Sequence, residues 1–97
     1  MTYRFDSDVW RWESRAQDWF FATVPAEVGE EIAALPLPPR GFGSVPVSVT
    51  IGATTWTTSI FPSGDSGVWS LPLKKAVRDA ERFGFGDTVS VALEVIR

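Results

Sequence analysis

The chain has 97 residues with no cysteine and no histidine, and its twelve acidic and nine basic side chains give a net charge of −3. This composition excludes disulfides, thiolate metal sites and the catalytic constellations built on histidine or cysteine, and it disfavours broad, charge-driven binding to nucleic acid. The length supports one domain, residues 1–97, and 44% hydrophobic with 22% charged residues is ordinary for a folded soluble protein. No stretch resembles a signal peptide or reaches the length of a membrane span, so we expect a cytoplasmic protein.

Alternation of apolar and polar residues predicts six strands. In chain order they cover residues 3–12, 19–24, 44–51, 54–61, 68–71 and 88–95. The first has a possible bulge near Asp6 to Asp8, and Pro46 places the third at a sheet edge or at a strand start. Short polar or glycine-containing turns join most strands, so we expect an antiparallel sheet. Closure removes exposed edges, which favours a mainly β fold, a small closed or partly open six-stranded barrel.

Two short helices are expected between these strands. The first covers residues 25–35, although Gly29 weakens helix formation and the regular helix could start only there. The second begins at Pro72, and Gly84 can end it in a left-handed cap. Residues 36–43, rich in proline and glycine, are expected to form an extended loop.

The second helix has two contrasting faces when its residues are placed at 3.6 per turn. The apolar face carries Leu73, Ala76, Val77, Ala80 and Phe83. The opposite face carries the four cations Lys74, Lys75, Arg78 and Arg82. Two interpretations stay open. The basic face either binds an anion or an acidic partner, mainly through Lys75 and Arg78, or it is solvated or forms salt bridges with the acids of the first helix.

Three other motifs have weaker claims to chemistry. The letters GDSG (64–67) surround the nucleophile of chymotrypsin-like proteases, but Ser66 has no histidine to activate it, and these are turn residues. GFG (41–43) is half of a phosphate-binding loop, without the lysine that such loops need. Asp6 and Asp8 could face one cation, but nothing nearby supplies the remaining ligands, so solvated strand charges are expected.

Five tryptophans are many for a chain of this length. They could stack on sugars or bases, or they could fill the interior of a small barrel. We expect most of them in the core, with one or two at a mouth or at a partner surface. The five are Trp10, Trp12, Trp19, Trp56 and Trp69.

Several segments together resemble a known family. WRW, WFFATVP, GFGSVPVSVTIGATTWTTSIFP and WSLPLKKAVRDAERFGFGDTVSVALEV are similar to the bacterial family catalogued as domain of unknown function nineteen-oh-five. The resemblance implies a small barrel of the double-split type with no established activity. Its most specific parts include TTSIFP, whose hydroxyls Thr58 and Ser59 could join the basic helix in binding.

The same barrel type implies a more distant likeness to AbrB-like and MazE-like regulators. In these a Leu/Ile-Pro pair, a short helix and a Gly-Asp turn precede a strand, as Leu71-Pro72 and Gly86-Asp87 do here. Those regulators bind DNA as swapped dimers through basic residues. This chain departs from them because it is acidic overall and its N-terminal arm has one arginine against two aspartates.

The leading hypothesis is a non-enzymatic binding domain, monomeric or homodimeric, with no cofactor, metal or catalytic residue. Its site would comprise Lys74, Lys75, Arg78, Arg82, Thr58 and Ser59, and its ligand would be anionic or an acidic protein. The alternative is an AbrB-like dimeric DNA-binding regulator, which the net charge disfavours. A third hypothesis, an enzyme that uses carboxylates and hydroxyls alone, has no positive signal.

Overall fold

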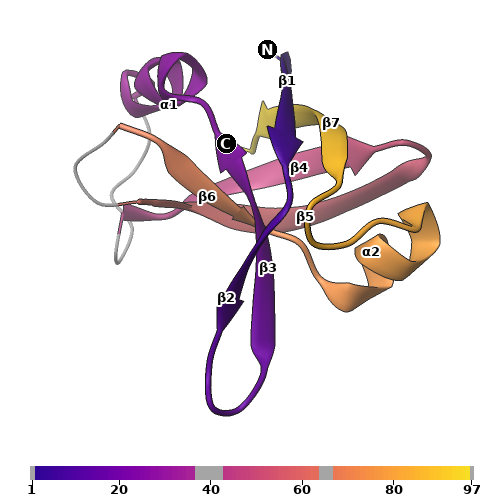
Figure 1. Cartoon of the computed structure of the whole chain (residues 1–97). Coiled ribbons are helices and arrows are strands. Elements are labelled where there is room, and N and C mark those ends of the chain that lie inside the picture. The colour runs from indigo at the N-terminus through magenta and orange to yellow at the C-terminus, as the bar shows by residue number, and fades with distance from the viewer. Residues whose placement is uncertain (1, 37–42, 64–66, 97) are drawn as a thin grey trace.

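A computed structural model describes residues 2–36, 43–63 and 67–96 (Figure 1). Within these residues seven strands form one antiparallel sheet in the order β1-β7-β4-β5-β6-β3-β2. The strands are β1 (Thr2–Asp8), β2 (Trp10–Glu13), β3 (Asp18–Val24), β4 (Val45–Ile51), β5 (Thr54–Pro62), β6 (Trp69–Pro72) and β7 (Thr88–Val95), and the helices are α1 (Ala26–Ala33) and α2 (Lys75–Glu81). Neither helix is long and apolar enough to cross a membrane, a statement limited to this described part of the chain.

The sheet curls into a half-barrel because its two terminal strands are neighbours in the chain. β1 and β2 lie at opposite ends of the strand order, yet Val9 alone separates them in sequence. The main-chain N–H of Thr23 in β3 donates to the Ser7 hydroxyl at 2.9 Å, which joins β3 to β1. The predicted mainly β, antiparallel architecture with two short helices is confirmed, with seven strands instead of six.

Val9 accounts for the additional strand. Its N–H donates to the Asp87 carbonyl at 2.7 Å, and its carbonyl accepts from the Gly86 N–H at 3.0 Å. The side chain of Val9 is buried. The first predicted strand is therefore interrupted at Val9, because the loop before β7 pairs with this residue. β1 pairs with β7 in regular register from Thr2 to Asp8, so the prediction of a bulge near Asp6 to Asp8 is wrong.

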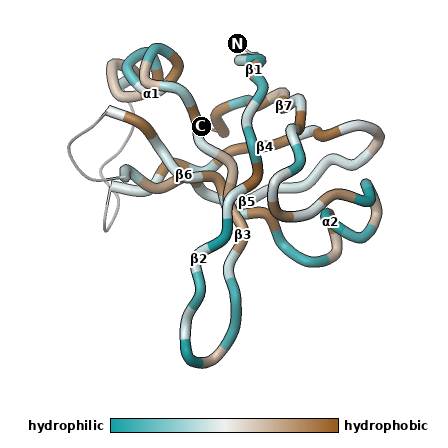
Figure 2. The backbone as a smooth tube through the Cα atoms, viewed as in Figure 1, coloured by the Kyte–Doolittle hydropathy of each residue, from teal (hydrophilic) through white to brown (hydrophobic). Residues whose placement is uncertain are grey.

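Alternation within the strands builds the core. Along β4, every second residue is buried, and β7 shows the same pattern over its first six residues. Figure 2 colours the chain by hydropathy and shows hydrophobic residues along both strands. Pro46 is the second residue of β4, which lies between β5 and β7, so this proline marks a strand start and not a sheet edge. The largest fully buried side chains are Ile32, Ile60, Leu71, Leu93, Val9, Val24, Val47, Val49 and Val77.

Gly29 does not delay the first helix, which begins at Ala26 after Pro25 as N-cap. It is buried against β6. A Cβ atom at this position would lie 2.5 Å from Trp69 Cδ1 and 2.7 Å from the Gly67 carbonyl oxygen. Close approach of the helix to the sheet therefore explains this glycine better than local flexibility does.

The second helix begins at Lys75 and not at the predicted Pro72, which is the last residue of β6. Its C-terminal cap also differs from the prediction. Arg82 is the left-handed residue, with φ of 56°, whereas Gly84 has no positive φ. The Gly84 N–H donates to Asp87 Oδ2 at 2.8 Å, and the Asp87 N–H donates to the Gly84 carbonyl at 3.1 Å. Gly84 therefore belongs to a separate turn that the Asp87 side chain closes, and the prediction of a glycine cap is wrong.

The apolar face of α2 is also narrower than predicted. Leu73 and Val77 are buried and Phe83 is half-buried, but Ala76 and Ala80 are exposed. Within α2 itself only Val77 is buried, and the helix packs against β5 at the side of the half-barrel (Figure 1).

Candidate functional site

The β2–β3 hairpin projects away from the rest of the molecule and has two unlike faces (Figure 1). Its register pairs Trp12 with Trp19 and Trp10 with Phe21, and the second pair of rings stacks at 4.7 Å between centroids. These four rings share one face, because paired residues point to the same side of a sheet. The opposite face carries Arg11, Glu13, Asp18 and Phe20.

The second hairpin face, the strand β5 and the start of α2 enclose a cleft of about 430 Å³. We call it the basic cleft, because three cations lie along one wall. The residues that line it are Gln17, Asp18, Trp19, Phe20, Trp56, Thr57, Thr58, Pro72, Leu73, Lys74, Lys75 and Arg78. Its volume falls within the range of small-molecule sites.

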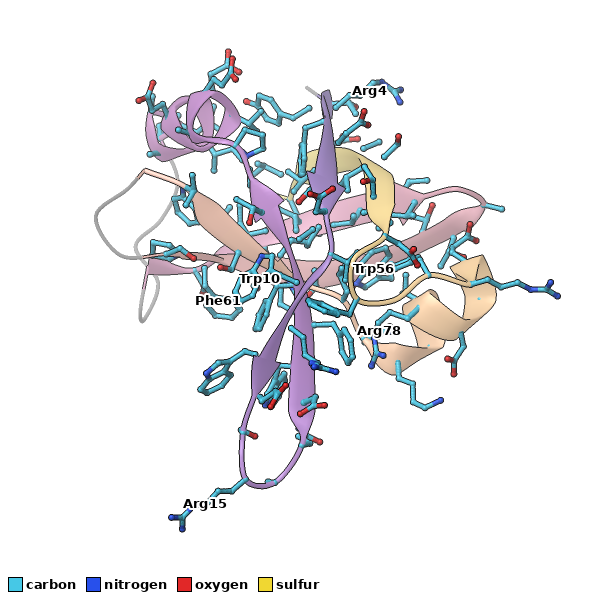
Figure 3. The ribbon with its side chains drawn as sticks, viewed as in Figure 1. Arg4, Trp10, Arg15, Trp56, Phe61 and Arg78 are labelled. Atoms are coloured by element: carbon cyan, nitrogen blue, oxygen red, sulfur yellow. The ribbon has the colours of Figure 1, made fainter. Side chains whose placement is uncertain are left out.

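Arg78 is the best fixed of the three cations. Its guanidinium lies over the Phe20 ring, with 3.8 Å between Cζ and the ring centroid, and its Nε donates to the Leu73 carbonyl at 3.1 Å. The side chain is half-buried, and Figure 3 shows it directed from α2 toward the hairpin. No carboxylate forms an ion pair with Arg78 within the described part of the chain. Its charge is therefore held in place by contacts that do not neutralise it.

The two lysines are exposed to solvent, so their side chains are less restricted than the half-buried side chain of Arg78. Lys75 Nζ lies 2.6 Å from Asp79 Oδ2, one helical turn farther along α2. Both partners are largely exposed, so the pair contributes little to stability and can exchange for another anion. Lys74 has no ion-pair partner among the described residues. Neither lysine pairs with the acids of α1, so that alternative for the basic face is not what the structure shows.

Trp56 adds an unusual polar group to the cleft. The residue is 8% exposed, and its Nε1 is a buried donor with no hydrogen-bond partner among the described residues. A buried N–H without an acceptor is unfavourable, so native proteins rarely keep one without a reason. Figure 3 shows Trp56 above Arg78, and both residues line the basic cleft.

Four of the six predicted site residues meet at this cleft and two do not. Lys74, Lys75, Arg78 and Thr58 line it, whereas Arg82 and Ser59 do not. Arg82 is the exposed residue that ends α2, and Ser59 sits one position farther along β5, opposite Pro46. The prediction that four cations share one helix face is wrong, because α2 has lost its regular geometry by Arg82.

Sequence reasoning missed the contribution of the hairpin. Phe20, Asp18 and Gln17 come from a strand and turn more than fifty positions before α2. Trp56 and Thr58 alternate on β5, which could have placed them together. Nothing in the sequence indicates that the hairpin bends toward the second helix.

Asp6 and Asp8 are held by neighbouring hydroxyl groups. Asp6 Oδ1 accepts from the Ser90 hydroxyl at 2.7 Å, and Asp8 Oδ1 accepts from the Thr88 hydroxyl at 2.6 Å. No group of three potential metal ligands occurs within the described residues. The GDSG and GFG predictions rest mainly on residues 64–66 and 41–42, which lie outside those that the structure describes.

The tryptophans divide between core and surface. Trp56 is buried, Trp10 and Trp69 are half-buried, and Trp12 and Trp19 are 57% and 44% exposed. The two exposed rings line a second, shallower groove of about 380 Å³ together with Phe21, Phe61, Ser70 and Pro72. We call this the aromatic groove. It lies mainly on the hairpin face opposite Phe20 and Asp18, and it adjoins the basic cleft, since Trp19 and Pro72 line both.

The model of one family matches most of the chain. This family is described as Domain of unknown function (DUF1905), and the match covers residues 5–93. No curated protein matches the chain. The matched residues include both hairpin strands, β5 and the whole of α2, and therefore every residue that lines the basic cleft.

Proposed function

The chain belongs to the DUF1905 family, and from this premise we propose that it is a non-enzymatic binding domain that holds a small organic anion in the basic cleft. The observation that carries the proposal is that three cations line one cleft together with Trp56, whose indole N–H is buried behind this lining without a partner among the described residues. A cleft with this charge is notable in a chain whose net charge is −3, because the surrounding acids would otherwise repel an anion.

The geometry of Arg78 fits a carboxylate or a phosphate. Its Nε is used by the Leu73 carbonyl, whereas its two Nη groups have no hydrogen-bond partner within the described residues. A guanidinium presents such groups as a planar fork, which matches two oxygens of one anion. Because the Phe20 ring already supports the guanidinium, little rotational freedom is lost when the anion binds.

The rest of the lining favours a ligand with an apolar body. Phe20, Trp56, Pro72 and Leu73 supply ring and aliphatic surface beside the cations. Such walls bind the apolar part of a ligand, while a few polar groups fix its orientation. We therefore propose an aryl or acyl carboxylate, or a phosphate ester of similar size, in preference to a bare inorganic ion.

Support for a role without catalysis comes from the same lining. Asp18 is the one carboxylate that lines the cleft among the described residues. Hydrolysis by carboxylates commonly uses a pair, one as acid and one as base or nucleophile. The enzyme hypothesis keeps a test, which is a screen for hydrolase and transferase activity with the intact chain.

Calorimetric titration tests the proposal with phenyl phosphate, benzoate and inorganic phosphate, and with benzyl alcohol as the uncharged control. We expect the two aryl anions to bind with Kd values of about 10 µM to 1 mM, and benzyl alcohol to bind far more weakly. Added salt should weaken binding, because the lysines are exposed. If none of the anions binds at low salt, the proposal is wrong.

Variants identify the cleft as the place of binding. Lys74→Gln with Lys75→Gln should weaken aryl anions at least ~10-fold while leaving the free energy of unfolding within about 0.5 kcal/mol, since both residues are exposed. Arg82→Gln with Arg4→Gln is the matched control, because it also removes two exposed cations and neither of them lines the cleft. Equal losses in both variants would point to charge attraction without a site.

Trp56→Phe tests the role of the indole. The N–H is covered in this conformation, so a ligand reaches it by displacing a lining side chain. We expect weaker anion binding in Trp56→Phe, which keeps an aromatic ring but removes the donor. Unchanged affinity would show that the ligand does not use this group, and would leave the cations and the other polar lining residues as its polar contacts.

The DNA-binding alternative stays a prediction, as do the double-split barrel type and the likeness to AbrB-like regulators. A concave cleft that holds three cations suits a small ligand better than a duplex, which needs a basic surface along its length. A gel-shift titration with genomic fragments at low salt tests the alternative. Absence of a shift at micromolar protein would exclude it.

A further inference from the structure

The outer edge of β2 carries main-chain groups that no strand pairs with. The Phe20 carbonyl accepts from the Leu73 N–H at 2.8 Å, on the side of β3 away from β2. Its partner in β2 is Arg11, so Arg11 and, two residues later, Glu13 direct their N–H and C=O groups away from β3. Val9 follows the same alternation, because its N–H and C=O bond to the loop before β7. β2 is the last strand in the sheet order, so these groups form an open edge.

Exposed aromatic rings extend from this edge strand inward across the sheet, from Trp12 on β2 to Phe61 on β5. Trp12 is 57% exposed, Trp19 is 44% exposed and Phe61 is 40% exposed. All three line the aromatic groove. Contiguous exposed apolar surface of this kind on a soluble domain commonly marks an interaction surface.

We propose that two copies of the chain pair their β2 strands antiparallel about a two-fold axis at Trp12. This register places Arg11 opposite the partner's Glu13, and by symmetry Glu13 opposite the partner's Arg11. The N–H and C=O groups of Arg11 and Glu13 face outward, so each of these pairs exchanges two main-chain hydrogen bonds. The two pairs together give four main-chain hydrogen bonds across the axis. Opposite charges at facing positions stabilise a strand pair.

The charges of Arg11 and Glu13 favour a two-fold axis at Trp12 over an axis shifted by one residue in either direction. A two-fold axis at Arg11 would place Arg11 opposite the partner's Arg11, and an axis at Glu13 would place two glutamates opposite each other. Like charges at facing positions are unfavourable. Within a single copy, Arg11 Nη2 lies 2.8 Å from Glu13 Oε1, and the Arg11 Cζ lies 5.0 Å from the centroid of the Phe85 ring. Pairing across the axis exchanges the first of these contacts for the same contact with the partner.

The length of the open edge agrees with this pairing. Beyond Val9, the place beside the strand is taken by the Gly86 and Asp87 main chain. At the other end, the Ser14 hydroxyl bonds the Gln17 main chain and closes the hairpin turn. The strand is therefore open over the four residues of β2 and no farther. Pairing would place the two Trp12 rings side by side, where each covers part of the exposed surface of the other.

Two like-charged variants test the pairing because each is complementary to the other. Arg11→Glu gives two acids per strand and Glu13→Arg gives two bases. Sedimentation equilibrium from about 10 to 500 µM should show the unchanged chain as a weak dimer, since the interface is small. Each variant alone should need at least about 10-fold higher concentration to dimerise. An equimolar mixture of the two, and the doubly exchanged chain Arg11→Glu with Glu13→Arg, should dimerise like the unchanged chain.

Arg4→Glu is the matched control for Arg11→Glu, because it makes the same change in net charge on an exposed residue of β1. The proposal is wrong if the unchanged chain is a monomer at about 500 µM. It is also wrong if the equimolar mixture of the two variants dimerises no better than each variant alone.

A cross-linking measurement keeps the proposal testable if a charge variant fails to fold. The chain has no cysteine, so Trp12→Cys introduces a single thiol at the proposed axis. Facing residues of a pair that is not hydrogen-bonded have Cα atoms about 4.5 Å apart, within disulfide reach. Mild oxidation should give a covalent dimer much faster than for Thr55→Cys, on an exposed position of β5. Equal rates for the two variants would also overturn the proposal.

Discussion

Replacing Arg78 with methionine separates the structural part of the basic segment from its binding part. Methionine keeps an apolar stem that reaches the position of Nε but removes the guanidinium. Two contacts are lost: the stacking on Phe20 at 3.8 Å and the hydrogen bond from Nε to the Leu73 carbonyl at 3.1 Å. The first is worth about 0.5–1 kcal/mol at a partly exposed site, and a hydrogen bond from a charged donor about 1.5 kcal/mol. Water at the cleft can replace part of the second, so we expect a net loss of about 1–2 kcal/mol.

Urea unfolding followed by tryptophan fluorescence measures this loss. For a domain of 97 residues, 1 kcal/mol corresponds to about 4–8 °C in Tm, so Arg78→Met should melt about 5–15 °C lower. Arg82→Met is the control and should stay within about 0.5 kcal/mol. A double-mutant cycle with Phe20→Leu should give a coupling free energy of about 0.5–1 kcal/mol. Stability of Arg78→Met equal to that of the unchanged chain would refute the view that Arg78 anchors α2 to the hairpin.

Two glycine substitutions test the packing of the helices. Gly29→Ala improves helix propensity by about 1 kcal/mol, but its Cβ would lie 2.5 Å from Trp69 Cδ1, so we expect a net loss of about 1–2 kcal/mol in chemical unfolding. A more stable variant would show that β6 yields easily. Gly52→Ala combines a positive φ of 59° with a Cβ 1.9 Å from Glu81 Oε1, and Gly86→Ala combines a φ of 88° with open space. Both variants should lose about 1–2 kcal/mol in the free energy of unfolding from backbone strain. The loss should be larger in Gly52→Ala, and the difference between the two variants measures the cost of displacing the Glu81 side chain.

The strands were predictable because burial repeats every second residue. In β4 the four residues Val45, Val47, Val49 and Ile51 are buried, as their alternation indicates. The division of the first strand at Val9 was not predictable. It depends on hydrogen bonds to Gly86 and Asp87, which lie nearly eighty positions away, and local patterning carries no record of so distant a partner.

The site was predictable in its cations but not in its shape. Lys74, Lys75 and Arg78 stand close together in sequence, so any compact helix brings them to one region. The idea of one basic face failed at Arg82, because a left-handed residue ends the helix where the helical wheel assumes that it continues. The wheel also treats all four cations alike. The stacking of Arg78 on Phe20 is a tertiary contact, and it distinguishes this arginine from its neighbours.

The two proposals meet in the β2–β3 hairpin, since one face of it contributes Asp18 and Phe20 to the basic cleft and its outer edge carries Arg11 and Glu13. A hairpin that projects from the sheet is held by few contacts of its own, so pairing with a second copy should restrict its motion. Restricting the motion of β3 would hold the Phe20 ring under the Arg78 guanidinium before the anion binds. Coupling of this kind is reciprocal, so an anion that binds the dimer more tightly must strengthen the dimer by the same factor. Sedimentation with and without phenyl phosphate measures that factor, and a value of one would show that cleft and edge act independently.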